Sequence, residues 1–143
     1  MIRKVTEHDL VMIHQTEGQL FGPDDSMDAI KRAIIERKDS LYFMDIEGEM
    51  QGYIGVHVNA PTADIATLFT VPSYRRKGVA TALLKHAMNI LKNMNIERVI
   101  LDVSTTNHAA SQMYQKLGFT PVATRKKYYP DGSDARVLKK ELT

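Results

Sequence analysis

The 143-residue sequence contains no cysteine. Disulfides, thiolate metal sites and a cysteine nucleophile are therefore excluded. The five histidines show neither H-x-x-x-H nor H-E-x-x-H spacing, so we expect no metal site. No apolar run approaches the roughly 20 residues that a membrane-spanning helix needs, and no charged segment followed by an apolar core opens the chain. These absences favour a cytoplasmic protein that makes no membrane contact.

Excess charge of either sign is also missing. Nineteen Lys and Arg residues stand against 17 Asp and Glu residues, which gives a net charge of +2. So small a charge argues against a general nucleic-acid binder and for local basic patches. The 43% hydrophobic and 25% charged residues are typical of a globular protein. A chain of this length buries about two-thirds of its unfolded surface, so we expect one domain over residues 1–143.

Hydrophobic periodicity predicts a strand at residues 1–5 and two helices, at 7–20 and 27–37. Gly22-Pro23 is expected to end the first helix, and Asp24-Asp25-Ser26 to cap the second. Further along, a hairpin turn at 47–49 joins two β-type runs. The other predicted strands are 41–46, 50–58, 64–71, 98–103, 121–129 and 135–142, and the other helices are 79–94 and 107–117. This order of elements indicates an α/β protein in which helices cover both faces of a mixed sheet.

The segment between the strand at 64–71 and the next helix carries an unusual charge pattern. Three cations, Arg75, Arg76 and Lys77, directly precede Gly78 and the start of the helix. Cations at this end oppose the helix dipole, while the first N–H groups of the helix lack partners within it, so the pattern favours a bound anion. A P-loop is excluded because Lys77 precedes Gly78, which argues against nucleotide hydrolysis. By itself the segment is equally compatible with a solvated basic turn.

Two motifs together make the assignment specific. Arg75-x-x-Gly78-x-Ala80 resembles the acyl-CoA pyrophosphate loop, R/Q-x-x-G-x-G/A, of the GNAT superfamily of N-acetyltransferases. Asn107-x-x-Ala110-x-x-x-Tyr114-x-x-x-Gly118-Phe119 resembles the helix that follows the fifth strand in these proteins. Within the superfamily the chain is most similar to the ribosomal-protein alanine N-acetyltransferase group. That similarity lies in residues 66–69, in Asp102 and in Arg125-x-x-Tyr128-Tyr129-Pro130.

The resemblance implies a GNAT fold, with a central, mostly antiparallel sheet of six or seven strands. It also implies transfer of an acetyl group from acetyl-CoA to a primary amine by direct attack in a ternary complex. The acceptor would be a protein N-terminal α-amine, a lysine or a small amine, and the alanine-type resemblance favours the first. No metal is implied, and a monomer or homodimer is expected. A non-catalytic acyl-CoA-binding or interaction module on the same fold is the alternative.

The resemblance also implies how acetyl-CoA is held. Backbone N–H groups of residues 75–81 and the guanidinium of Arg75 or Arg76 would bind the pyrophosphate. The strand that ends at Val71 would pair with the pantetheine arm, and the Val71 N–H would polarise the thioester carbonyl. Asn107 would hold the arm from the far side. The expected cofactor-binding residues are Phe69, Thr70, Val71, Arg75, Arg76, Lys77, Gly78, Val79, Ala80, Thr81, Asn107 and Tyr114.

Catalysis needs a base, because an amine must be neutral when it attacks. Asp102 takes the position of a glutamate base in the alanine group, and since aspartate is one methylene shorter, a bridging water is expected. Asp64 lies where other GNAT enzymes keep a catalytic glutamate, so both carboxylates stay candidates and Asp102 is favoured. Tyr114 would protonate the leaving thiolate, since a phenol with a pKa near 10 keeps its proton at pH 7.

Each of these residues also has a purely structural interpretation. Asp102 could pair with Arg98 or Arg125, and Asp64 could cap a turn. Tyr114 could be a core aromatic residue, and Asn107 a helix cap. The pair Tyr128-Tyr129 would line the acceptor entrance or form a hairpin aromatic pair, and the first two helices are candidates for acceptor contacts.

Overall fold

The computed structural model describes residues 1–21 and 27–142, so the predicted helix stop at Gly22-Pro23 and cap at residues 24–26 lie outside it. Within the described residues, seven strands form one sheet in the order β1-β2-β3-β4-β5-β7-β6. Their bounds are β1 Ile2–Lys4, β2 Ser40–Glu47, β3 Glu49–Asn59, β4 Thr62–Thr70, β5 Arg98–Ser104, β6 Thr120–Arg125 and β7 Ala135–Glu141.

Neighbouring strands are antiparallel except for β4 and β5, which run parallel and are joined by helix α3, Val79–Asn93. A parallel pair needs a crossover connection, and the helix after the basic loop supplies it. The mixed, mostly antiparallel sheet predicted from the sequence is therefore confirmed.

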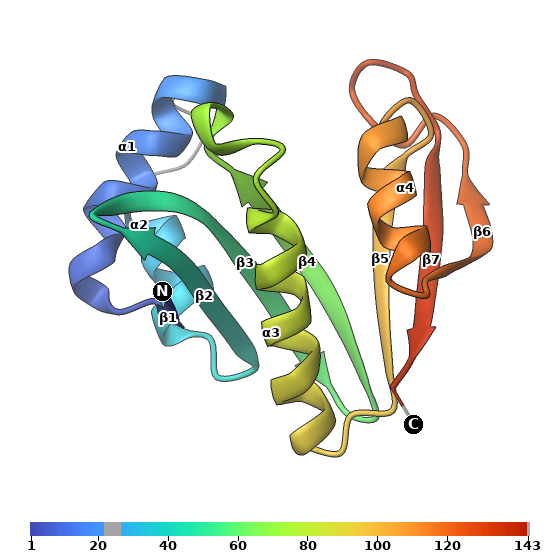
Figure 1. Cartoon of the computed structure of the whole chain (residues 1–143), viewed down its shortest axis with the longest axis horizontal. Coiled ribbons are helices and arrows are strands. Elements are labelled where there is room, and N and C mark those ends of the chain that lie inside the picture. Colours follow the sequence, from blue (N-terminus) through green and yellow to red (C-terminus); the bar gives the residue numbers. More distant parts are fainter. Residues whose placement is uncertain (22–26, 143) are drawn as a thin grey trace.

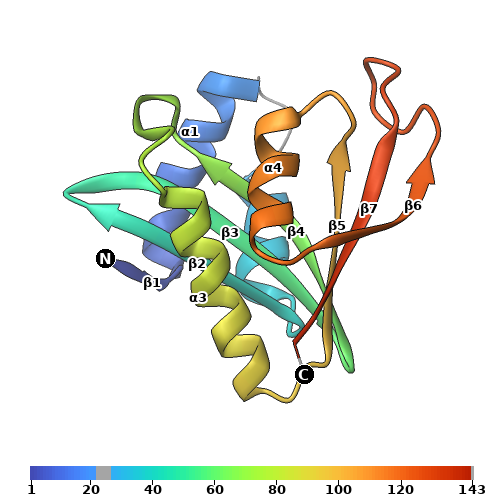
Figure 2. The same cartoon turned by 45° about the vertical axis from the view of Figure 1, so that its right-hand side comes forward.

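Helices cover both faces of this sheet, as expected (Figures 1 and 2). Helix α3 and helix α4, His108–Lys116, lie on one face, while α1, Leu10–Phe21, and α2, Met27–Lys31, lie on the other. Each pair of helices buries its own apolar cluster against the strands. The sheet therefore separates two independent layers of side chains, and the α3/α4 face and the α1/α2 face can carry different chemistry.

The two helices that flank the site begin and end as the sequence predicts. Helix α3 follows Gly78 and buries the stripe Val79, Leu83, Leu84, Ala87, Met88 and Leu91. Helix α4 is capped by Asn107, whose side-chain Oδ1 accepts from the Ala110 N–H at 3.1 Å. Gly118, with φ at +94°, ends it in the conformation that glycine adopts without steric cost.

Near the N-terminus the structure differs from the prediction in detail. The first helix opens with a 3₁₀ turn, Glu7–Asp9, where the Asp9 carboxylate accepts from the Thr6 N–H and from the Arg3 guanidinium, each at 2.8 Å. The second helix continues beyond α2 as a π-helical turn, Arg32–Glu36, because the Arg37 N–H bonds to the Arg32 carbonyl five residues back. Periodicity alone does not resolve such changes of helical pitch.

The predicted strand at 121–129 is too long, because β6 ends at Arg125. Lys127 has φ at +49°, which turns the chain out of the extended conformation. The N–H groups of Tyr128 and Tyr129 then both donate to the Ser133 carbonyl, at 3.1 and 3.2 Å, and close a compact tip on the β6–β7 hairpin. The two tyrosines therefore lie in this tip, which projects beyond the sheet.

Strands β4 and β5 are paired over only a short length, from Thr62–Arg98 to Asp64–Ile100. Immediately afterwards β4 carries an extra residue, Ala66, because Thr67 pairs with Gly55 whereas Ile65 pairs with Val56. Such a bulge bends the strand that contains it. Figure 1 shows the two strands meeting at their paired ends and separating steadily beyond. The sheet is thus open between β4 and β5 along more than half of each strand.

Candidate functional site

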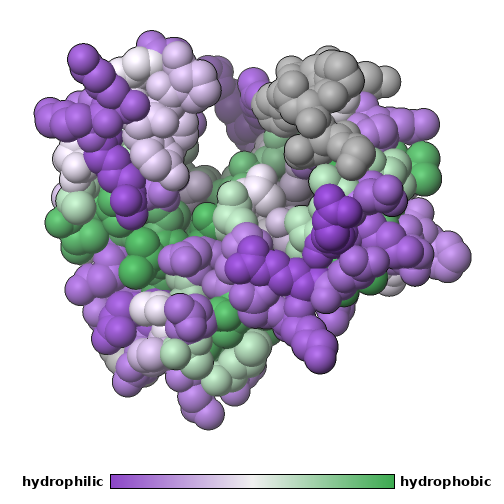
Figure 3. Space-filling model, turned by 180° about the vertical axis from the view of Figure 1, so that it is seen from behind, coloured by the Kyte–Doolittle hydropathy of each residue, from purple (hydrophilic) through white to green (hydrophobic). Residues whose placement is uncertain are grey.

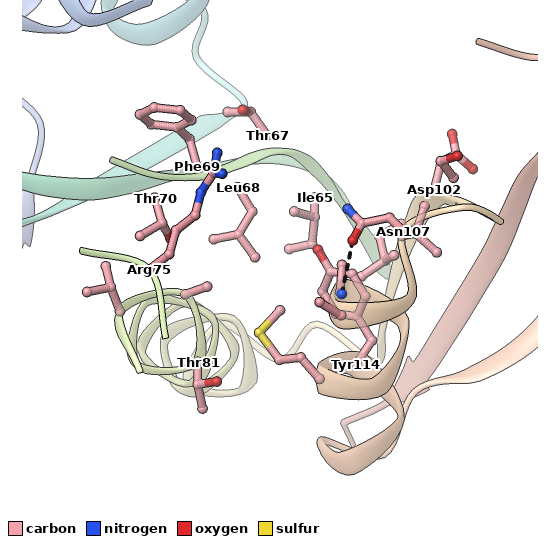
Figure 4. A pocket seen from close by; sticks show the side chains of 18 of the residues that line it. Ile65, Thr67, Leu68, Phe69, Thr70, Arg75, Thr81, Asp102, Asn107 and Tyr114 are labelled. Carbon is pink, nitrogen blue, oxygen red and sulfur yellow. Dashed lines mark hydrogen bonds between the residues drawn. The ribbon is translucent and has the colours of Figure 1, made fainter. Parts of the chain in front are cut away.

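A cleft of about 910 Å³ lies where the two strands separate. Its walls come from β4, the basic loop, the first turn of α3, β5, α4 and the β6–β7 hairpin tip (Figure 4). The lining residues are 65–70, 74–76, 78–81 and 101–104, together with Asn107, Ala109, Ala110, Met113, Tyr114 and Tyr129.

The basic loop presents backbone donors to one end of this cleft. Gly78 precedes α3 with φ at +82°, and Arg76 holds φ at +65°, a left-handed conformation that costs a residue with a Cβ roughly 1–2 kcal/mol. The Ala82 N–H is already bonded to the Gly78 carbonyl, at 3.0 Å, whereas the N–H groups of the preceding turn have no acceptor within the helix. Figure 4 shows the Arg75 side chain reaching from the loop toward Phe69 and Leu68. The arrangement is suited to a phosphate group.

Lys77, expected among the cofactor-binding residues, is not among those that line the cleft. Its ammonium lies 5.5 Å from the centre of the Tyr74 ring, a cation–π contact. The Tyr74 hydroxyl in turn donates to the Glu49 carboxylate at the start of β3. Lys77 therefore contacts, from outside the cleft, the tyrosine that links the loop to the β2–β3 hairpin.

The predicted role of the Val71 N–H needs correction. This group donates to the Gln51 carbonyl at 2.8 Å, so it is already used by β3. Because directly opposed residues of antiparallel strands alternate between bonded and non-bonded pairs, the N–H groups of Leu68 and Thr70 point away from β3, toward the open edge. The sequence analysis did not identify Leu68 as a site residue. The alternation of N–H directions along a strand with one unpaired edge is the pattern that could have identified it.

Tyr114 lies on the α3/α4 side of the cleft and is only 7% exposed. Its ring packs edge-on against Phe119, with 5.6 Å between ring centres. Burial, and to a lesser degree the nearby Tyr129, raises the pKa of the Tyr114 hydroxyl to about 12. The phenol therefore keeps its proton throughout the physiological range.

Asp102 lies on the other side of β5, and Figure 4 shows its carboxylate pointing away from Tyr114. The Arg125 Nε lies 3.4 Å from the Asp102 Oδ1, so the structural pairing expected for this aspartate is present. The contact is monodentate, and the Asp102 and Arg125 side chains are 30% and 56% exposed. Exposed pairs of this kind contribute little and exchange readily with water or another cation.

Asp64 lies outside the cleft lining, at the closed end where β4 and β5 are still paired. It faces the same side of the sheet as Asp102, because it is paired with Ile100, two residues before Asp102 on β5. Asp102 is thus displaced from it by one pleat repeat, about 6.6 Å, toward the open end. Among the two carboxylates, Asp102 is the one that the cleft reaches.

The structure thus brings together most, but not all, of the predicted site residues. Asp64, Val71 and Lys77 lie outside the lining. The predicted residues that line the cleft are Phe69, Thr70, Arg75, Arg76, Gly78, Val79, Ala80, Thr81, Asp102, Asn107 and Tyr114. Tyr129, expected at the acceptor entrance, also lines it, and its pKa is raised by burial and then by the charge of Asp102. Met113 and Ser104 are among the lining residues that were not predicted.

The part of the chain that the structure describes contains neither a metal-binding cluster nor a membrane-spanning helix. No group of three or more His, Asp or Glu side chains there is arranged to hold a metal ion. None of the helices in that same part is long and apolar enough to cross a membrane.

Known proteins resemble the chain in sequence and in structure. Residues 8–119 match the Acetyltransferase (GNAT) family. The N-alpha-acetyltransferase of Sulfurisphaera tokodaii is 32% identical over 116 residues, which cover 72% of this chain and 70% of that protein. The crystal structure of the ribosomal-protein-S18-alanine N-acetyltransferase from Escherichia coli superposes with a TM-score of 0.89 at 25% identity, covering 100% and 94% of the two chains.

A third likeness is one of fold alone. Arabidopsis thaliana NAA60, in a crystal structure of its complex with acetyl-CoA, has the same fold, with a TM-score of 0.83 at 17% identity over 99% of this chain and 97% of that one. The family match covers most of the chain and includes both the basic loop and helix α4. The chain therefore belongs to the Acetyltransferase (GNAT) family and is an acetyl-CoA-dependent N-acetyltransferase.

Proposed function

We propose that the acceptor is the N-terminal α-amine of a protein or peptide, acetylated by direct attack on acetyl-CoA. The observation that carries the proposal is the two-sided cleft, with Tyr114 on one face of the sheet and Asp102 on the other. Proteins named for N-alpha and for alanine N-acetylation are among those the chain resembles. The separated faces would allow the thioester and the amine to approach from opposite sides.

The strength of the available base also favours an α-amine. An α-amine titrates near 8 and a lysine near 10.4, so deprotonation at pH 7 costs about 1.4 kcal/mol for the first and about 4.6 kcal/mol for the second. A carboxylate that acts through water is a weak base and is better matched to the smaller cost. Asp102, open to solvent on the face of β5 opposite Tyr114, meets that description.

The acceptor would enter on the α1/α2 face. Seen from behind in Figure 3, the surface is hollowed beside the hydrophilic projection of the β6–β7 hairpin, with apolar residues on the floor. Thr67, Phe69 and Asp102 belong to this side, and Tyr129 flanks it from the hairpin tip. An extended N-terminal segment fits a hollow that is walled on one side by a hairpin and floored by a sheet.

Acetyl-CoA would lie on the α3/α4 face. Its pyrophosphate would bind the N–H groups that follow Gly78, together with Arg75 or Arg76. The amides of its pantetheine arm would pair with the open edge of β4, and Asn107 would hold the arm from α4. The Leu68 or Thr70 N–H then becomes the donor to the thioester oxygen, in place of the Val71 N–H.

The proposed reaction uses both faces in sequence. A water relays one proton from the acceptor ammonium to the Asp102 carboxylate, and the neutral amine attacks the thioester carbonyl to form the C–N bond. The resulting oxyanion is stabilised by an N–H of the β4 edge. As the C–S bond breaks, the Tyr114 hydroxyl gives its proton to the thiolate of CoA. The second amine proton and the proton held by Asp102 pass to solvent, and Tyr114 recovers a proton from water, so one proton is released overall.

Other predictions from the sequence stay predictions. They are a single domain over residues 1–143, a cytoplasmic location, and a monomeric or homodimeric state.

A panel of acceptors tests the proposed substrate class. Purified enzyme and acetyl-CoA are mixed with peptides that have a free N-terminus, with the same peptides blocked at the N-terminus but containing lysine, and with small diamines, and free CoA thiol is measured. We expect release with free N-termini at least tenfold faster than with the other two classes. Faster release with the blocked, lysine-containing peptides would reassign the acceptor.

Substitution of Gly78 tests the phosphate loop. A Cβ at Gly78 meets no atom within 4 Å, but φ at +82° makes alanine costly there, and the new methyl would face the bound phosphate. Gly48 is a matched control, with φ at +78°, an equally open surrounding and a position in the β2–β3 turn. Gly78→Ala and Gly48→Ala should lose similar stability, about 1 kcal/mol. Only Gly78→Ala should weaken acetyl-CoA binding, by roughly tenfold, as measured by calorimetry.

Two isosteric substitutions separate the candidate bases. We expect Asp102→Asn to lower kcat/KM for the best acceptor by about 100-fold, because the proton relay loses its acceptor. Asp64→Asn, at the closed end of the strands, should lower it by less than about threefold. Both variants should bind acetyl-CoA as the wild type does. A larger loss in Asp64→Asn than in Asp102→Asn would transfer the role of base to Asp64.

Tyr114→Phe tests the proton donor. Removal of the hydroxyl should reduce kcat by about 100-fold while acetyl-CoA affinity changes by less than threefold. Because the pKa of Tyr114 is raised to about 12, the wild-type rate should rise with pH as the acceptor amine loses its proton, and then stay level up to about pH 10. An alkaline decline that begins near pH 8 in the wild type would contradict this assignment.

A further inference from the structure

The tip of the β6–β7 hairpin is joined to the turn between β5 and α4 by a chain of side-chain hydroxyls. The Ser104 Oγ lies 3.0 Å from the Ser133 Oγ and 2.8 Å from the Thr106 Oγ1. The Ser133 Oγ also lies 2.7 Å from the Asp131 Oδ1. Four consecutive polar groups, two from each segment, therefore form one line of contacts.

The carboxylate at one end sets the direction of this chain. Hydrogen bonds from the side chain and the N–H of Ser133 lower the pKa of Asp131, which is thus ionised at neutral pH and can only accept. Ser133 has a single hydroxyl proton, which it gives to Asp131, so Ser104 must donate to Ser133. Ser104 then accepts from the Thr106 hydroxyl, and the chain has one consistent polarity.

The backbone adds a second connection between the same two segments. The Thr105 N–H donates to the Asp134 carbonyl at 3.0 Å. The Ser133 carbonyl accepts from the N–H groups of Tyr128 and Tyr129, and the Asn107 N–H donates to the Ser104 carbonyl at 3.0 Å. Ser133 therefore organises the segment that carries Tyr129, and Ser104 organises the one that carries Asn107.

These two segments serve different substrates in the proposed function, on which this inference rests. Asn107 is on the donor side of the cleft, and Tyr129 flanks the acceptor side. We propose that Ser104 and Ser133 are positioning residues whose contact couples the turn that holds acetyl-CoA to the hairpin tip that forms the acceptor wall. Binding of acetyl-CoA then orders the acceptor wall through this hydroxyl pair.

The contact is suited to such a role because it is small and local. Both serines are half-buried, and the net contribution of one hydrogen bond, about 0.5–1.5 kcal/mol, is too small to decide whether the hairpin folds. It is large enough to change the orientation of the tip, since a free energy of that size changes an equilibrium by roughly two- to tenfold. Loss of the contact should therefore affect acceptor binding more than stability.

Amide hydrogen exchange on the 143-residue protein tests the coupling without requiring turnover. In the wild type, acetyl-CoA should slow exchange both at residues 104–107 and at the hairpin tip, residues 126–134. In Ser133→Ala the slowing should persist at 104–107 and disappear at 126–134. Ser104→Ala, which removes the same contact from the other side, should behave alike, while Ser133→Thr should restore the response. An unchanged response at 126–134 in both alanine variants, or no response there in the wild type, would overturn the proposal.

Steady-state kinetics give the second readout. Ser133→Ala should raise the KM for the acceptor peptide by about three- to tenfold, the size of one net hydrogen bond, with the dissociation constant of acetyl-CoA changed less than twofold. Ser111→Ala, which removes a hydroxyl from the first turn of α4, is the matched control and should leave both values unchanged. An equal rise of KM in Ser111→Ala would also overturn the proposal. If the wild type acetylates no amine at all, the proposed function fails, whereas the exchange experiment still decides the coupling.

Discussion

The structure depends on the early separation of β4 and β5. Three residue pairs hold these strands together, and the extra residue Ala66 bends β4 away as soon as the pairing ends. A sheet that is open at its centre exposes backbone N–H and C=O groups that must find partners. In this protein the unpaired part of β4 lines the cleft, so the irregularity in the sheet leaves backbone N–H and C=O groups available there.

The charges and the burial of side chains differ between the two sides of the opening. Cations and left-handed backbone gather at the N-terminus of α3, an arrangement that opposes the helix dipole and becomes favourable when a phosphate binds. The two sides also differ in how far their ionisable side chains are buried. Tyr114 is enclosed and retains its proton, whereas Asp102 is in reach of water. Strand β5 therefore separates a buried, protonated phenol from a partly exposed carboxylate.

Much of this arrangement was predictable from the sequence, because it depends on local signals. The apolar stripe of α3, the Asn107 cap and the conformation of Gly78 are each encoded within a few residues. The sequence predicted a free Val71 N–H, whereas this group donates to the distant Gln51 carbonyl. The hairpin tip was taken for strand because Tyr128 and Tyr129 have high β propensity, whereas the Ser133 carbonyl decides their conformation. A contact between strands accounts for the first error, and the hydrogen bonds of a short local turn account for the second.

The opposed faces of the sheet have a consequence for how a catalytic cycle would finish. If the two substrates enter through separate openings, the two products can also leave through separate openings. The acetylated product then leaves without passing through the side of the cleft that binds acetyl-CoA. Free CoA leaves without passing through the side that binds the acceptor. Neither needs to wait for the other, so replacement of the coenzyme can begin while the modified chain end is still in place.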